Sequence, residues 1–150
     1  MNEDSLKTAL VAIIPKSLDD VIRANRDRAK LRLTTDEEVM ALHQEVSSGR
    51  VKAKIEEWRF ITLHALPYQD EPESIQVMLL GEVERTGHTR ITSVVRKIDL
   101  DRQFVFTNSG SLYQLGKRGE GEPPFHHLTM VCSAFHDWGF GRALGVPEFF

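Results

Sequence analysis

The chain has little of what disulfide-bonded, secreted or membrane-spanning proteins depend on. Only one of its 150 residues is cysteine, so no disulfide can form within the chain, and this favours a reducing compartment. The longest apolar runs, residues 9–14 and 77–80, are far too short to cross a bilayer. The first residues lack the basic and apolar regions of a signal peptide. Together these absences predict a soluble, cytoplasmic protein with no membrane partner.

The chain also has a small net charge, and its glycines match no nucleotide-binding motif. The net charge is -3, so no overall field draws the protein to nucleic acid. The glycines of residues 139–145 follow a predicted helix instead of a strand, and the third comes one position too late for a dinucleotide fingerprint. Those of residues 116–121 lack the Gly-Lys-Ser/Thr ending of a phosphate loop. We therefore expect no cofactor.

The first 49 residues are predicted to form three helices, over residues 4–14, 17–32 and 35–47. The first ends at a proline, which cannot continue the helical hydrogen bonds. In the third, Thr35 and Glu38 have the spacing of a capping box. The second is predicted from apolar side chains at helical spacing, namely Leu18, Val21, Ile22 and Ala29.

Between residues 50 and 116 the apolar period becomes that of strands. The short links favour an antiparallel meander, because parallel strands need long crossovers. In the first strand the alternation changes face near Glu56 and Glu57, which predicts either a bulge or a strand covered on both sides. The predicted strands cover residues 51–66, 75–83, 91–100, 104–107 and 112–115.

The most distinctive stretch is residues 125–150, which hold five of the eight Phe, three of the six His and the only Cys. A flexible polar loop over residues 116–124 precedes it. A helix over residues 126–138 is predicted, with Gly139 as its C-terminal cap. We therefore expect a single α+β domain over residues 1–150: N-terminal helices, an antiparallel sheet or half-barrel of about five strands, and a C-terminal helix packed on the sheet.

Two side chains of the last helix are weak candidates for catalysis. Cys132 and His136 lie four residues apart, so a thiol nucleophile and a base can meet there. However, Cys132 lies at the centre of the apolar stripe, whereas reactive cysteines occupy exposed, electropositive surroundings. A buried, inert thiol is therefore the favoured interpretation. Metal binding is not expected, because the adjacent His126 and His127 are predicted to point in different directions on a helix.

Basic side chains of the second predicted helix and of the loop after the strands offer a surface for nucleic acid. Their contacts with phosphates would weaken steeply with salt. Aspartates interleave with them, so a self-neutralised surface is the alternative interpretation. The basic residues are Arg23, Arg26, Arg28, Lys30, Lys117 and Arg118.

Aromatic and arginine side chains at the end of the chain offer a surface for a protein partner, because these residue types are enriched at binding hot spots. The alternative is that they fold back onto the sheet and complete its core. A regulatory protein that acts without catalysis through a protein partner is the leading hypothesis. Nucleic-acid binding is the second and a Cys/His enzyme the third, and an exposed strand edge would support a homodimer. The candidate partner residues are Trp138, Phe140, Arg142, Phe149 and Phe150.

Overall fold

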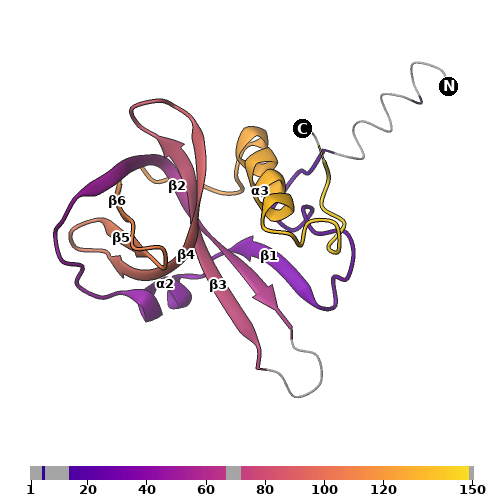
Figure 1. Ribbon diagram of the computed structural model, residues 1–150, viewed down its shortest axis with the longest axis horizontal. Coiled ribbons are helices and arrows are strands. Elements are labelled where there is room, and N and C mark those ends of the chain that lie inside the picture. The colour runs from indigo at the N-terminus through magenta and orange to yellow at the C-terminus, as the bar shows by residue number, and fades with distance from the viewer. Residues whose placement is uncertain (1–4, 6–13, 67–71, 149–150) are drawn as a thin grey trace.

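The computed structural model describes Ser5, residues 14–66 and residues 72–148. It shows an α+β fold with a six-stranded sheet and a C-terminal helix packed on it (Figure 1). No helix among the described residues is long and apolar enough to span a membrane. The elements in chain order are β1 (Ala29–Leu33), α2 (Asp36–Leu42), β2 (Val51–Ala65), β3 (Ser74–Val83), β4 (Thr89–Asp99), β5 (Phe104–Thr107), β6 (Leu112–Leu115) and α3 (Phe125–Asp137).

The strands follow one another in the order β1-β2-β3-β4-β5-β6 as an antiparallel meander, as the short links predict. The first half of β2 also pairs in parallel with β6, and this pairing nearly closes β2 to β6 into a five-stranded ring. In Figure 1 the ring occupies the left of the molecule, and β1 and α3 lie to its right. The long β2 thus belongs to both halves of the fold.

A bulge in β2 lets this one strand serve both halves. The pairing with β3 shifts register between Glu56 and Arg59, and Glu57 has a φ of 51°. This confirms the predicted change of face near Glu56 and Glu57. Opposite the bulge, a Cβ atom on Gly81 would lie 2.8 Å from the carbonyl oxygen of Glu56 and 2.4 Å from Cγ2 of Ile55. Glycine is therefore required for β3 to pass so close to the bulge.

The predicted helix over residues 17–32 is wrong. The structure has turns through residues 17–28, where Asn25 takes a φ of 56°, and then strand β1, which pairs with the second half of β2. Within β1, Leu31 and Ala29 are buried while Lys30 between them is exposed, which is the two-residue period of a strand. Leu18 and Ile22 are nevertheless fully buried, as predicted. The sequence of this segment fits both the helical and the strand pattern, and pairing with β2 makes Ala29–Leu33 a strand.

The capping box at the start of α2 is confirmed. The amide of Glu38 donates to the Thr35 hydroxyl, and the Glu38 carboxylate accepts from the Thr35 amide. The helix ends at Leu42, earlier than the predicted residue 47, because His43 takes an extended conformation and pairs with Ile98 of β4. The predicted helix over residues 4–14 falls largely outside the described residues.

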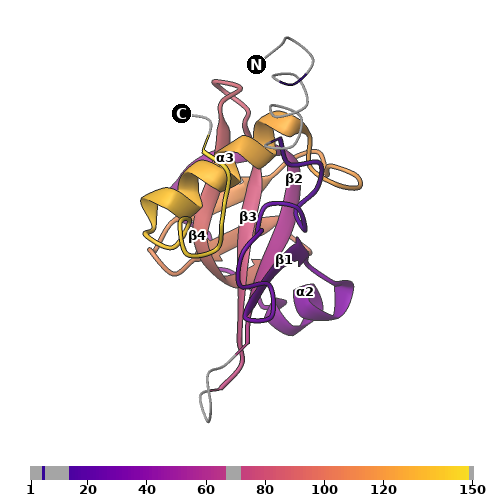
Figure 2. The same cartoon turned by 90° about the vertical axis from the view of Figure 1, so that its right-hand side faces the viewer.

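Two apolar clusters lie on opposite sides of the shared strands. One fills the ring and includes Trp58, Leu79 and Ile98. The other lies between α3 and the outer face of β1, β2, β3 and β4, and it includes Ile61 and Phe135. The helix itself packs on β4. Figure 2 shows α3 running across the sheet over the strands that this second cluster covers.

The end of the chain completes the second cluster. Gly139 ends α3 with a φ of 93°, as predicted. The chain then turns back so that Val146 is buried and Phe140 packs against the cluster. The backbone oxygen of Leu144 accepts hydrogen bonds from the amides of Arg23 and Ala24. The alternative that this segment folds back is therefore confirmed as far as Val146.

The loop before α3 is tied to the bulge of β2, although the sequence predicts a flexible segment. The guanidinium of Arg59 is buried and donates from Nε to the carbonyl oxygen of Gly121 at 2.8 Å and from Nη2 to that of Glu120 at 2.7 Å. The indole of Trp58 donates to the carbonyl oxygen of Gly116 at 3.0 Å. These contacts fix the path by which the chain reaches α3.

Candidate functional site

Several cationic side chains line a hollow at one end of the ring. The hollow has a volume of about 710 Å³ and is bounded by the start of β2, the β3–β4 hairpin and the β5–β6 turn. We call it the basic hollow. Its cationic side chains are Arg50, Lys52, Lys54 and Arg85.

Only one carboxylate, that of Glu84, is among the residues lining the basic hollow. Lys54 holds it in place, because its Nζ lies 3.1 Å from Glu84 and 3.7 Å from Glu56. The hydrogen bond with Glu84 raises the pKa of Lys54 above its ordinary value, so this ammonium stays charged. Arg50, Lys52 and Arg85 are exposed and have no carboxylate partner among the described ion pairs. Their charge is therefore available to a ligand.

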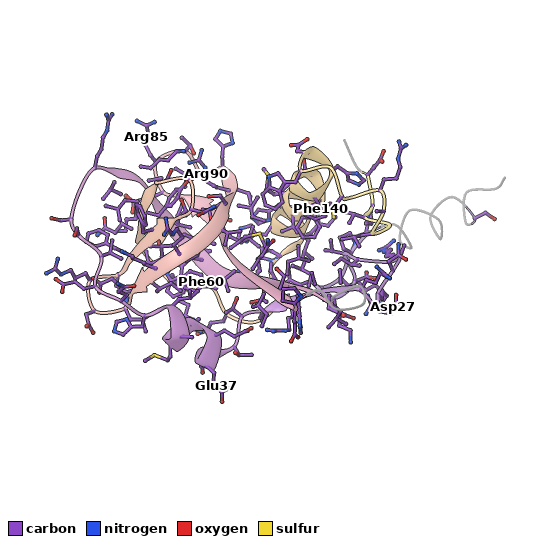
Figure 3. All side chains as sticks on the ribbon, turned by 60° about the horizontal axis from the view of Figure 1, so that its bottom comes forward. Asp27, Glu37, Phe60, Arg85, Arg90 and Phe140 are labelled. Carbon is purple, nitrogen blue, oxygen red and sulfur yellow. The ribbon has the colours of Figure 1, made fainter. Side chains whose placement is uncertain are left out.

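Apolar side chains also line the basic hollow. Val51, Ala53, Val83 and Leu112 contribute to the lining. Arg90 lies nearby in Figure 3, which shows its side chain and that of Arg85 at the same end of the molecule. The Nη1 atom of Arg90 reaches the hydroxyl of Tyr113 across the ring at 3.4 Å.

The residues predicted to bind nucleic acid lie elsewhere and do not share one helix face. Arg23 pairs with Asp20 at 3.2 Å, and Arg26 pairs with Asp19 at 2.9 Å. Figure 3 places Asp27, which belongs to this segment, at the opposite end of the molecule from Arg85. For Arg23 and Arg26, neighbouring aspartates thus neutralise the positive charge, as the alternative interpretation predicts.

The two cationic residues of the loop before α3 also have local partners. The Nζ of Lys117 lies 3.6 Å from Glu57. The guanidinium carbon of Arg118 lies 5.6 Å from the centre of the Trp58 ring, within the range of a cation–π contact. Both therefore help to fix the loop against the bulge of β2.

Sequence reasoning missed the basic hollow, although part of its signal is visible. Arg50, Lys52 and Lys54 alternate with apolar residues at the start of a predicted strand. In an extended chain such side chains project toward one side. That Arg85 joins them depends on the pairing of β2 with β3, which no local pattern reveals.

The thiol of Cys132 is not arranged as a nucleophile. It is fully buried, and this burial raises its pKa to about 11. The Nε2 atom of His136 lies 2.8 Å from the backbone oxygen of Val146, so the imidazole joins α3 to the returning chain. The interpretation of Cys132 as a buried thiol is confirmed.

A separate group of three polar side chains, two of them histidines, lies where α3 begins. The Nε2 atoms of His126 and His127 lie 2.7 Å and 3.0 Å from the same carboxylate oxygen of Glu82 on β3. The argument that adjacent histidines point apart is wrong here, because both rings reach around the first turn of α3 to one acceptor. Hydrogen bonds from the two imidazoles lower the pKa of Glu82, whereas burial lowers the pKa of His127.

The described aromatic residues at the end of the chain divide between the core and the surface. Phe140 packs against the cluster under α3, whereas Trp138 is 43% exposed and Arg142 is exposed. The Trp138 ring centre lies 5.9 Å from that of Phe135 and 6.1 Å from that of Phe140. Phe149 and Phe150 lie outside the described residues.

Comparison of the chain with protein-family models, with curated proteins and with solved structures finds no match. The function of the chain is therefore inferred from its geometry and charge.

Proposed function

We propose that this protein binds the phosphate backbone of a nucleic acid strand in the basic hollow. The single observation that supports the proposal is the gathering of four cationic side chains around one concave surface with one carboxylate, in a chain whose net charge is -3. Such local fields attract polyanions even where the overall charge does not.

The arrangement favours a ligand with several phosphates over a single small anion. Lys52 and Lys54 are two residues apart on an extended chain, so their Cα atoms are separated by up to about 7 Å. Arg85 approaches from the β3–β4 hairpin and Arg50 from the segment before β2. Charges separated in this way can each meet a different phosphate along a strand.

The lining residues predict binding without base specificity. They include no aromatic side chain on which a base can stack, and stacking contributes much of the affinity of dedicated single-strand binders. Recognition then depends on phosphate contacts, which carry no direct sequence information. We expect moderate affinity that falls steeply with salt.

The test is fluorescence anisotropy with labelled single-stranded RNA, single-stranded DNA and duplex DNA at low salt. Wild-type protein is compared with the double variant Lys52→Glu, Arg85→Glu, which reverses two charges of the basic hollow. Because the hollow is concave, we expect the single strands to bind more tightly than the duplex, and the variant to lose binding to all three.

The matched control is the double variant Lys16→Glu, Lys30→Glu, which changes the net charge equally at two exposed lysines of the segment, residues 16–32, that carries basic residues first predicted to bind nucleic acid. We expect it to bind like wild type. Loss of binding in this control alone would move the interaction to that segment. Absence of binding by wild-type protein to every probe would refute the proposal.

A protein partner at the end of α3 is a second proposal, supported by the exposed Trp138 ring beside Phe135 and Phe140. Tryptophan is enriched at binding hot spots, and a ring held by neighbouring aromatics loses little entropy on binding. Trp138→Ala should then abolish recovery of a partner from nuclease-treated lysate. Equal recovery by this variant and by wild type would refute the second proposal.

A further inference from the structure

The first turn of α3 brings together three side chains of the types that ligate transition metals. Glu82 comes from β3, and His126 and His127 from the start of the helix. One ligand atom from each lies within 4.8 Å of the others. The two imidazole rings stand edge to face with their centres 4.5 Å apart, so both Nε2 atoms reach the same carboxylate.

We propose that Glu82, His126 and His127 form a binding site for a divalent transition metal ion such as Zn²⁺. Two imidazole nitrogens and one carboxylate oxygen make a donor set that suits Zn²⁺ and its neighbours in the first transition row. Three protein ligands leave a fourth position for water, which is the composition of catalytic zinc sites, whereas structural sites use four protein ligands.

The ligand atoms must move apart from their hydrogen-bonded positions to admit an ion. Around a tetrahedral Zn²⁺ with bonds of about 2.0–2.1 Å, neighbouring ligand atoms stand about 3.3 Å apart. The Glu82 oxygen now lies 2.7 Å and 3.0 Å from the two histidine nitrogens. The two histidine ligand atoms lie within 4.8 Å of each other. His127 is held in the core, so the exposed His126 ring and the half-buried Glu82 side chain are the groups that must adjust around an ion.

Metal ligation requires a carboxylate and neutral imidazoles. Both Nε2 atoms now meet the Glu82 carboxylate, so a metal ion bound there would take the place of these two hydrogen bonds. Each imidazole would then carry its one proton on Nδ1 and offer the lone pair of Nε2 to the metal.

An ion has a route from solvent on the side of His126. The His126 side chain is 58% exposed and borders an open hollow of about 530 Å³ between α3 and the β3–β4 hairpin. This gives room for a water molecule at the fourth position. The hollow is lined by His88, Thr89, Phe125, His126, Thr129, Met130 and Ser133.

The environment of the His127 ring sets an upper limit on the affinity for the metal. The Nδ1 atom of His127 is buried and has no hydrogen-bond partner among the described residues. When Nε2 binds a metal, Nδ1 carries the proton, and metal-bound histidines normally donate that proton to a carboxylate or carbonyl. Loss of such a partner typically lowers metal affinity by about 10–100-fold. We therefore expect tighter binding than a surface histidine pair but weaker binding than a structural zinc site.

Without a metal, Glu82 still has a structural role that the test must separate from ligation. The N-cap of α3 is Pro124, which provides no side-chain hydrogen bond. A carboxylate beside the first turn offsets the positive end of the helix dipole. Loss of stability in a Glu82 variant therefore does not by itself indicate a metal.

The experiment is a titration of the untagged full chain, first treated with a chelator, with Zn²⁺ by calorimetry and with Co²⁺ by visible absorption. We expect one equivalent of either ion to bind, with a Co²⁺ spectrum of nitrogen and oxygen ligands. Glu82→Gln and His126→Ala should each weaken binding by about tenfold or more. Circular dichroism confirms that both variants are folded.

The matched control is His88→Ala, which removes an imidazole from the same hollow but not from the three proposed ligands. It should bind the metal like wild type. Lack of uptake by wild-type protein would overturn the proposal, as would unchanged affinity in both Glu82→Gln and His126→Ala. Equal losses in His88→Ala and His126→Ala would also contradict it, because they would assign binding to surface histidines in general.

Discussion

The Nη2 atom of Arg26 lies 2.9 Å and 3.0 Å from the two carboxylate oxygens of Asp19. The Nη1 atom of the same guanidinium donates to the carbonyl oxygens of Asp19 and Ile22, both at 2.7 Å. Arg26 therefore closes the turns that replace the predicted helix. Because these partners occupy its donors and offset its charge, Arg26 attracts a phosphate less strongly than the exposed cations of the basic hollow do.

The ion pair of Arg32 with Glu38 should make folding stability sensitive to acid. Hydrogen bonds from Arg32 lower the pKa of Glu38 from 4.5 to about 2. A carboxyl whose pKa is lower in the folded than in the unfolded chain stabilises the fold above the unfolded value, and this contribution is lost as pH falls from about 4.5 to about 2. Glu38→Ala should cost about 1–2 kcal/mol of unfolding free energy at pH 7.

Urea unfolding at pH 7 and at pH 3 measures this effect. The difference between wild type and Glu38→Ala should shrink at the lower pH. Glu37→Ala is the matched control, because it removes an exposed carboxylate from the first turn of the same helix. A cost for Glu38→Ala that is independent of pH would show that the ion pair does not stabilise the fold.

Cys132 should react with thiol reagents only after unfolding. Its side chain is fully buried, and a pKa of about 11 leaves almost no thiolate at neutral pH. Reaction with a chromogenic disulfide reagent should be slow in buffer and should release one equivalent in guanidinium chloride. Rapid labelling of the native protein would restore Cys132 as a candidate nucleophile.

Removal of the chain after Gly139 should strongly destabilise or unfold the protein. The deletion removes buried Val146 and the Leu144 carbonyl that accepts from Arg23 and Ala24. A milder change, Val146→Ala, should cost about 1–3 kcal/mol by removing buried methyl groups. Arg142→Ala, on the exposed side of the same segment, should stay within about 0.5 kcal/mol of wild type. A stable truncated protein would show that this segment is not part of the core.

Gly81→Ala should destabilise the fold where β3 passes the bulge of β2. The added Cβ would lie 2.4 Å from Cγ2 of Ile55 and 2.8 Å from the backbone oxygen of Glu56, so the strands must separate. Overpacking of this kind typically costs about 1–3 kcal/mol. Gly49→Ala is the control, since its Cβ would meet nothing closer than 3.9 Å. Equal unfolding midpoints in urea for the two variants would contradict the described geometry of the bulge.

Local signals in the sequence predicted much of the fold. The bounds of β5 and β6 agree with the prediction, because turn residues flank each short apolar run. The capping box of Thr35 and Glu38 and the glycine that ends α3 were likewise predictable from spacing alone. Such features depend on neighbours within a few residues.

What the sequence did not reveal depends on contacts distant in the chain. Residues 17–32 have apolar side chains at spacings that fit a helix, and only pairing with β2 makes Ala29–Leu33 a strand. The parallel pairing of β2 with β6 that nearly closes the ring joins segments about sixty residues apart. The candidate sites likewise depend on contacts between residues that are distant in the chain. Arg85 meets Lys52 through strand pairing, and Glu82 of β3 meets His126 only because α3 packs on the sheet, chiefly on β4.

The salt dependence of binding to single-stranded RNA tests the central claim most directly. If the three exposed cations of the basic hollow, Arg50, Lys52 and Arg85, contact phosphates, the plot of log K against log salt should have a slope of about -2. The double variant Lys52→Glu, Arg85→Glu should then reduce the slope to about half or less, while Lys16→Glu, Lys30→Glu leaves it unchanged. Equal slopes for wild type and the Lys52→Glu, Arg85→Glu variant would contradict the account, because they would show that the basic hollow does not meet the phosphates.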